Sequence, residues 1–233
     1  MKKKPLSDHG DSAKMRRFQA EADYGESVFL STIGDQAGSI KAVKRSLEWD
    51  PGYAPAIMTM GSVEYQLRRR AAGRKLFLSL LALPESTPHL IGIIDQAGDF
   101  LIDRGAYQDG LELFRGAAKK FPAATVFLQG VSCCASHQGC LDEAVSASER
   151  ALQLEPENQK LVTDLGWSLF LAGRQDEALT VLERAVAMNP AEKLARENLR
   201  LCKAGLAEFR RLIESERTTP PARQPRGRLK NKI

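Results

Sequence analysis

Aromatic residues are scarce in this sequence, and it has no long apolar run. Phe, Trp and Tyr make up 6% of the 233 residues, which disfavours an aromatic-rich β-sandwich or barrel. No segment approaches the roughly 18 consecutive apolar residues of a membrane-spanning helix. The basic start, MKKKPLSDHGDSAKMRRFQ, is not followed by the apolar stretch of a secretory signal. We therefore expect a globular protein without a transmembrane segment.

Cysteine is also rare, and its spacing predicts no disulfide framework. Of the four cysteines, Cys133 and Cys134 are adjacent, so a bond between them within a helix is unfavourable. Free thiols fit a reduced, cytoplasmic setting. Cys133, His137 and Cys140 have a spacing that could bind a metal, but no fourth ligand lies nearby in the sequence. We predict no metal and no cofactor.

Acidic residues are absent from one end of the chain. Residues 217–233 hold six Lys/Arg and no Asp or Glu, and residues 1–17 hold six Lys/Arg against two Asp. Because the net charge of the whole chain is only +5, the middle is acidic, and it is not a basic platform for nucleic acid. We expect disordered basic segments at 1–19 and 216–233, flanking a folded region at 20–215. Tails that contact nucleic acid or membranes are the alternative.

Prolines recur at a nearly constant interval. They fall at 51, 84, 122, 156 and 190, separated by 33, 38, 34 and 34 residues, and each ends a helical run. Within the last period the pattern predicts two helices, KLVTDLGWSLFLAG and EALTVLERAVAMNP, with Gly173 in the turn between them. A period near 34 is typical of stacked repeats. The extra residues of the longest interval, about ESTPHL, are expected to lengthen a loop between repeats.

The repeating unit resembles the tetratricopeptide repeat (TPR). The family pattern aromatic-x₂-Leu-Gly-x₂-Tyr, then Ala-x₃-Phe, then Pro, is met at Val162, Leu165, Gly166, Leu169, Ala178, Leu182 and Pro190. Earlier units keep parts of it, and the first unit matches only in its second helix. The helix after Pro190 has no partner and resembles a capping helix. The resemblance implies an all-α fold, an α-α superhelix of about five helix-turn-helix repeats plus a C-terminal capping helix.

In TPR proteins the first helix of each repeat lines a concave groove, so the resemblance also indicates where a partner would bind. Asp95, Asp99 and Asp103 recur at i, i+4 and i+8, where like charges repel. They form either a solvated face or an acidic strip for a basic peptide, and Trp167 either faces the groove or packs between repeats. Helical phase predicts these groove residues: Met58, Tyr65, Asp95, Asp99, Asp103, Gln129, His137, Thr163, Trp167 and Phe170.

The sequence contains no arrangement typical of catalysis, such as a nucleophile with its base or a glycine-rich phosphate loop. We predict a non-enzymatic scaffold that binds a protein or peptide segment, basic or apolar in character, and no small-molecule substrate. Two alternatives stay open: a TPR chaperone for a secreted or assembly client, and an adaptor that uses its basic tails. The positions where Hsp70- and Hsp90-binding TPRs carry cations are not basic, which disfavours that activity. Nucleic acid is an unlikely partner, and self-association through either end of the array stays open.

Overall fold

The computed structural model describes residues 8–218, and the helices in this range follow one another in pairs. They are α1 (Asp8–Thr32), α2 (Gln36–Trp49), α3 (Ala54–Gln66), α4 (Arg70–Ser79), the 3₁₀ helix η1 (Leu80–Ala82), α5 (Leu90–Asp103), α6 (Tyr107–Lys120), α7 (Thr125–His137), α8 (Leu141–Leu154), α9 (Gln159–Leu171), α10 (Gln175–Met188) and α11 (Lys193–Thr218). The described residues contain no strand. The predicted architecture of five helix pairs followed by a capping helix is confirmed.

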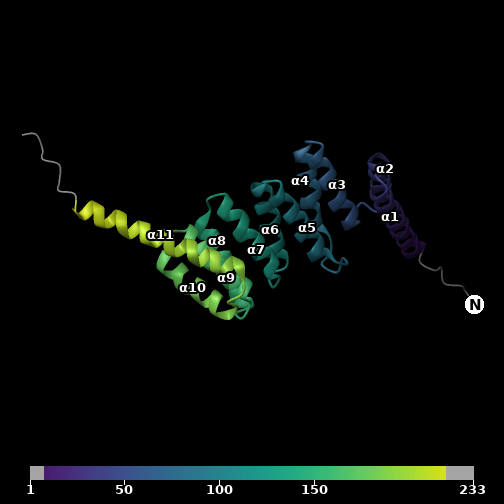
Figure 1. The fold of residues 1–233 in the computed structure, drawn as a ribbon. Coiled ribbons are helices and arrows are strands. Elements are labelled where there is room, and N and C mark those ends of the chain that lie inside the picture. Colours follow the sequence, from purple (N-terminus) through teal and green to yellow (C-terminus); the bar gives the residue numbers. More distant parts are fainter. Residues whose placement is uncertain (1–7, 219–233) are drawn as a thin grey trace, which may run out of the picture.

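The pairs succeed one another along an elongated molecule, with α1 and α2 at one end and α11 at the other (Figure 1). A continuous apolar core joins the middle pairs, extending from Ala54 in α3 to Leu161 in α9. The residues between η1 and α5 form the predicted longer loop. Within residues 8–218, no helix combines the length and apolarity needed to cross a bilayer.

The N-terminal helix is longer than the sequence predicted. Because α1 begins at Asp8, the prediction of a disordered segment at 1–19 is corrected for residues 8–19, which are helical. Arg17 shows why basic charge was a poor indicator of disorder here, because its charge is compensated in the fold. Its guanidinium donates hydrogen bonds to Glu21 at 2.9 Å and to Asp50 at 3.0 Å, and it lies 4.4 Å from the centre of the Tyr53 ring. At the other end α11 continues to Thr218, past the predicted boundary at 215. The remaining parts of both predicted tails, 1–7 and 219–233, lie outside the described residues.

The turn inside each pair uses one backbone conformation. Gly34, Gly105, Gly139 and Gly173 each follow the end of a first helix by two residues and have φ between 65° and 86°. This left-handed conformation ends a helix without steric cost for glycine. Arg68 takes the same place after α3 with φ 63°, although a side chain disfavours it. The missing glycine is one reason why the second unit keeps only part of the repeat pattern.

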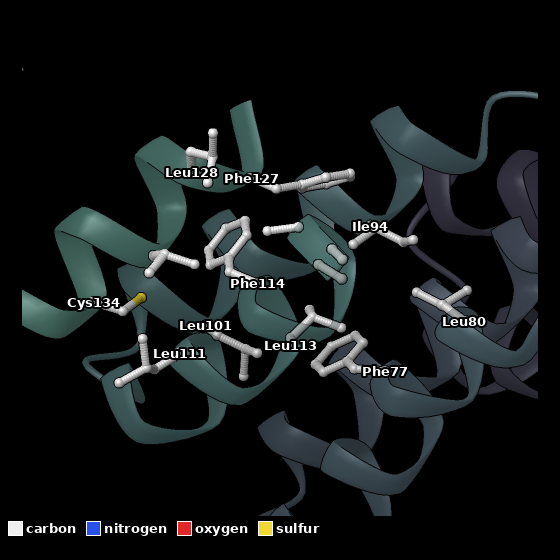
Figure 2. Close-up of a cluster of buried hydrophobic side chains, with 14 of the residues drawn as sticks. Phe77, Leu80, Ile94, Leu101, Leu111, Leu113, Phe114, Phe127, Leu128 and Cys134 are labelled. Carbon is white, nitrogen blue, oxygen red and sulfur yellow. The ribbon is translucent and has the colours of Figure 1, made fainter. Parts of the chain in front are cut away.

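Aromatic rings fill the space between pairs where glycine allows close approach. Phe114 of α6 is 1% exposed and packs among side chains of neighbouring helices (Figure 2). A Cβ on Gly98 of α5 or Gly130 of α7 would lie 2.0 Å or 2.4 Å from atoms of this ring. Any side chain at either position would therefore force helices α5, α6 and α7 apart. These glycines bring α5 and α7 close to α6, next to the cavity described below.

Candidate functional site

A cavity of about 580 Å³ lies along the first helices of the last three pairs, α5, α7 and α9. Asp95 and Asp99 of α5 and Asp164 of α9 bring carboxylates to it, and Lys160 brings one cation. Its apolar lining consists of Ile102, Phe114, Val126, Trp167 and Leu171. We call this cavity the acidic pocket.

Half of the predicted groove residues line the acidic pocket. They are Asp95, Asp99, Gln129, His137 and Trp167. Three helices that are separated in sequence by about one repeat bring them together. Trp167 lines the cavity, and its ring lies 5.3 Å from that of Phe170.

The other predicted groove residues do not line this cavity. Met58 and Tyr65 pack against the apolar core, and Asp103 is exposed beyond the end of the pocket. Thr163 is 2% exposed and donates its hydroxyl hydrogen to the carbonyl of Gln159 at 3.0 Å. Phe170 faces the capping helix, where a Cβ on Gly205 would lie 3.0 Å from its ring. Thr163 is therefore a buried residue bonded within α9, and Phe170 packs α9 against α11.

Asp164 is a carboxylate of the acidic pocket that sequence reasoning missed. The predicted groove residues of α9 were 163, 167 and 170, whereas the residues of α9 that line the pocket are 160, 164, 167, 168 and 171. Both sets follow helical spacing, and a single helix does not distinguish a step of three from a step of four. The sequence offered one indication that Asp164 faces the pocket, namely its position four residues after Lys160 and three before Trp167.

Two of the three pocket carboxylates, those of Asp95 and Asp164, are partly desolvated. Burial raises the pKa of Asp164 above its ordinary value and outweighs the hydrogen bond from Gln129 and the charge of Lys160. Gln129 Nε2 donates to Asp164 Oδ2 at 2.6 Å. Burial also raises the pKa of Asp95, with a further contribution from the neighbouring charge of Asp99. Both shifts mean that the pocket holds these negative charges at a cost.

Within the described residues, no cation forms an ion pair with these carboxylates. None of the ion pairs formed there includes Asp95, Asp99 or Asp164. With all groups ionised, three carboxylates and the single Lys160 leave the pocket a formal charge of −2. The pocket is therefore complementary to a positively charged group.

A cluster of buried serines joins the helices that form the pocket. The hydroxyls of Ser132, Ser148 and Ser168 lie 2.7 to 3.1 Å from one another and join α7, α8 and α9. Ser168 also donates to the backbone carbonyl of Asp164 at 2.9 Å. Because each buried hydroxyl has a partner, the network fixes the spacing of α7 and α9. It thereby positions Gln129 and Asp164, which face each other across that spacing.

The pocket side chains are not arranged for nucleophilic chemistry. Burial raises the pKa of the Cys133 thiol, and the nearby Asp164 and Asp99 raise it further. Burial likewise raises the pKa of Cys134 to about 12, so both thiols stay protonated at neutral pH. His137 stacks on Tyr107, with ring centroids 3.9 Å apart. Among the side chains that the structure describes, no three from His, Cys, Asp or Glu are grouped to hold a metal ion.

Comparison with known proteins places the repeat in a family. A family model described as tetratricopeptide repeat matches residues 135–199, which include α8, α9 and α10. The protein CTR9 homolog of Arabidopsis thaliana is 31% identical over 84 residues, covering 36% of this chain and 7% of that protein. DnaJ homolog subfamily C member 3 of Gallus gallus is 24% identical over 200 residues, covering 84% and 35%. The chain thus spans about a third or less of the length of these curated relatives.

Solved structures share the fold over most of the chain. The crystal structure of YrrB, described as a TPR protein with an unusual peptide-binding site, superposes with a TM-score of 0.55 at 18% identity, covering 82% of this chain and 97% of that one. MamA of Desulfovibrio magneticus RS-1 superposes with a TM-score of 0.51 at 15% identity, covering 78% and 98%. At these identities the likeness concerns the fold alone.

Proposed function

We propose, on the premise that the chain is a tetratricopeptide-repeat protein, that its acidic pocket binds an extended segment of another protein carrying Arg or Lys beside an apolar side chain. The chain would then act as a non-enzymatic scaffold. Its four cysteines are free thiols in the structure, and the cytoplasmic location stays a prediction.

The observation that carries the proposal is the partial burial of Asp95 and Asp164, neither of which forms an ion pair with the one cation of the pocket, Lys160. A charge held in a partly dry site raises the free energy of the folded protein unless a partner group compensates it. Asp95 and Asp164 show this cost as raised pKa values. A guanidinium or ammonium group entering the pocket would stabilise the ionised form of both carboxylates and form charge-assisted hydrogen bonds with them.

The apolar lining indicates what should accompany the cation. Trp167 is half-buried in the wall of the pocket, and its ring face can stack on a guanidinium, which favours Arg over Lys. Ile102 and Leu171 offer apolar contact for a neighbouring side chain. The pocket lies on a rigid array, so mainly the incoming segment loses conformational freedom on binding.

The test is a binding titration with two matched peptides. A fluorescein-labelled peptide of arginine, alanine and leucine should bind, and its glutamate-for-arginine counterpart should not. Replacing Asp95 and Asp99 together by Lys should weaken binding of the arginine peptide by about a hundredfold, because like charges then face each other. Binding of the arginine peptide should also weaken as salt is added.

The matched control changes the net charge equally but outside the pocket. Asp103 and Glu48 are exposed and do not line the cavity. The double variant Asp103→Lys with Glu48→Lys should bind the arginine peptide within about threefold of the unmodified protein. Equal losses in the two double variants would mean that only the overall charge matters, and the proposal would be wrong.

A second candidate function, a chaperone that shields an apolar client segment, is favoured by the surface of α1. Met15, Phe18 and Phe29 are 59%, 64% and 61% exposed, whereas Ala20 and Ser27, on the face that packs against α2, are buried. Exposed apolar patches of this kind are typical of interaction sites. The test is suppression of aggregation of a chemically denatured reporter enzyme. Phe18→Ser with Phe29→Ser should abolish suppression, and Asp95→Lys with Asp99→Lys should not.

A further inference from the structure

We propose that residues 219–233 of the chain itself occupy the acidic pocket and compete there with external partners. This inference rests on the proposed function, because it assigns an internal ligand to the same pocket. It makes the protein autoinhibited, so that a partner must displace its own basic segment.

The first argument is charge complementarity. The segment TPPARQPRGRLKNKI contains five Lys/Arg and no Asp or Glu, and it ends in a run, RLKNKI, that alternates cations with Leu229 and Ile233. The pocket combines a formal charge of −2 with an apolar lining. The run therefore has the composition that the pocket favours.

The second argument is that the described helices leave the segment within reach. Gly205 of α11 lies against Phe170, and the ring of Phe170 lies 5.3 Å from that of Trp167 in the pocket wall. From Gly205, α11 extends beyond the other helices to Thr218 (Figure 1), 13 residues or about 20 Å further on. A segment that starts at residue 219 therefore has to return by about the same distance.

Fifteen residues are long enough for that return. An extended chain covers about 3.3 Å per residue, so residues 219–233 span up to about 50 Å. The return along α11 and one interhelical spacing of about 10 Å together need about 30 Å. The roughly six residues that remain correspond to RLKNKI. Binding within one molecule is therefore geometrically possible and needs no second copy.

Tethering sets the size of the expected effect. A short linker holds its ligand at an effective concentration of about 1 mM. If the segment binds with a Kd of about 0.1 mM, it lowers the apparent affinity for an external peptide about tenfold. A cis competitor of this strength would be weak enough for a partner to displace.

The test compares the full chain with a variant lacking residues 219–233, using two labelled probes. The first probe is a synthetic peptide of residues 219–233, and the second is the arginine, alanine and leucine peptide. We expect the shortened protein to bind each probe about tenfold more tightly than the full chain. Introducing Asp95→Asn and Asp99→Asn should remove this difference. These neutral replacements are used because they keep the shape of the side chains.

A full-length control separates charge from length. Its five cations are replaced by glutamine: Arg223, Arg226, Arg228, Lys230 and Lys232. This control should bind both probes as tightly as the shortened protein does.

Each contrary outcome has a distinct meaning. Equal affinities for the full and shortened chains would overturn the inference. If the shortened chain binds only the arginine, alanine and leucine peptide, the inference fails and the proposed function stands. If the shortened chain binds neither probe, the proposed function fails as well. Sedimentation velocity tests for binding between two copies. If the full chain self-associates and the variant lacking residues 219–233 does not, the segment binds the pocket of a second copy, and the arrangement within one molecule is overturned.

Discussion

Two clusters of carboxylates in this array contrast in how their charge is compensated. Asp109 of α6 is 6% exposed and accepts hydrogen bonds from Tyr65 and from Arg70 Nε, the latter at 2.7 Å, while Arg74 lies 3.8 Å away. Burial alone would raise its pKa, but these partners outweigh burial and lower it. In the acidic pocket, burial dominates and the pKa values of Asp95 and Asp164 rise.

The difference separates carboxylates that stabilise the array from those available to a ligand. Arg70 and Arg74 belong to α4, one repeat before α6, so the Asp109 cluster ties two repeats together. The pocket carboxylates are likewise contributed by different repeats, but none of the ion pairs among the described residues joins them, although Lys160 lines the same cavity. Charged groups with perturbed pKa values in a cavity are typical of functional sites. The unpaired cluster is therefore the better candidate for binding.

The largest expected effect on stability is at the paired cluster. Asp109→Ala removes the acceptor of the Tyr65 hydroxyl and the counterion of Arg70, and should lower the free energy of unfolding by about 2 kcal/mol. The value is below that of a fully buried pair because Arg70 is 60% exposed. Urea denaturation measures the change, and the arginine peptide should bind the folded variant with unchanged affinity. A loss of affinity larger than about threefold would remove the distinction between the clusters.

The opposite change is expected at the pocket. Asp95→Asn with Asp99→Asn removes charges that the fold does not compensate, so the free energy of unfolding should stay level or rise by about 0.5 kcal/mol. The affinity for the arginine peptide, measured in protein lacking residues 219–233, should fall by about tenfold. Destabilisation comparable with that of Asp109→Ala would show that the pocket carboxylates are structural.

Changing the pH should affect the two clusters with opposite sign. A carboxylate with a raised pKa in the folded state binds protons more readily than in the unfolded state, so its contribution to stability improves as pH falls from that raised pKa towards about 3.9. For Asp95 and Asp164, acidification therefore reduces the free-energy cost of holding a buried charge, while the affinity for the arginine peptide declines over the same pH range. Asp109, whose pKa is lowered, loses stabilisation only below about pH 3.9.

The pH experiment combines urea unfolding with peptide titration at each pH. Comparison of the unmodified protein with the Asp95→Asn and Asp99→Asn variant isolates the pocket. Peptide affinity that rises on acidification would contradict the assignment of ionised carboxylates as the binding groups.

The smallest effect is expected at Asp164. Asp164→Asn keeps a hydrogen-bonding partner for Gln129 and removes one charge, so peptide affinity should fall about threefold and stability should change by less than about 0.5 kcal/mol. Calorimetric titration and urea denaturation measure the two quantities. An effect on affinity as large as that of the double substitution in α5 would make Asp164 the dominant group.

The periodic features of the fold were predictable, because they depend on backbone chemistry that repeats along the chain. Prolines mark the helix pairs, and turn glycines mark all of them except α3 and α4, where Arg68 takes the place of glycine and the unit keeps only part of the pattern. The start of α1 was not predictable from charge, since Arg17 finds its partners Asp50 and Tyr53 about one repeat later.

The candidate site was predictable only in part. Asp95 and Asp99 stood out because their repulsion has no local benefit, and both line the pocket. Asp164 was missed because one helix does not fix the phase to within one residue. Asp109 gave no signal, since its arginine partners are 35 and 39 residues away and no local spacing connects them. Compensation of charge is a tertiary property, and it is what distinguishes the two clusters.

The central claim is that the pocket carboxylates form no ion pair until a cationic segment enters the pocket. Carbon-13 NMR of the aspartate carboxyl groups, in protein lacking residues 219–233, measures their pKa values with and without saturating arginine peptide. We predict that Asp95 and Asp164 titrate above their ordinary value in the free protein and shift downward with peptide bound, while Asp109 stays low in both states. Unchanged pKa values of Asp95 and Asp164 at saturation would contradict the claim.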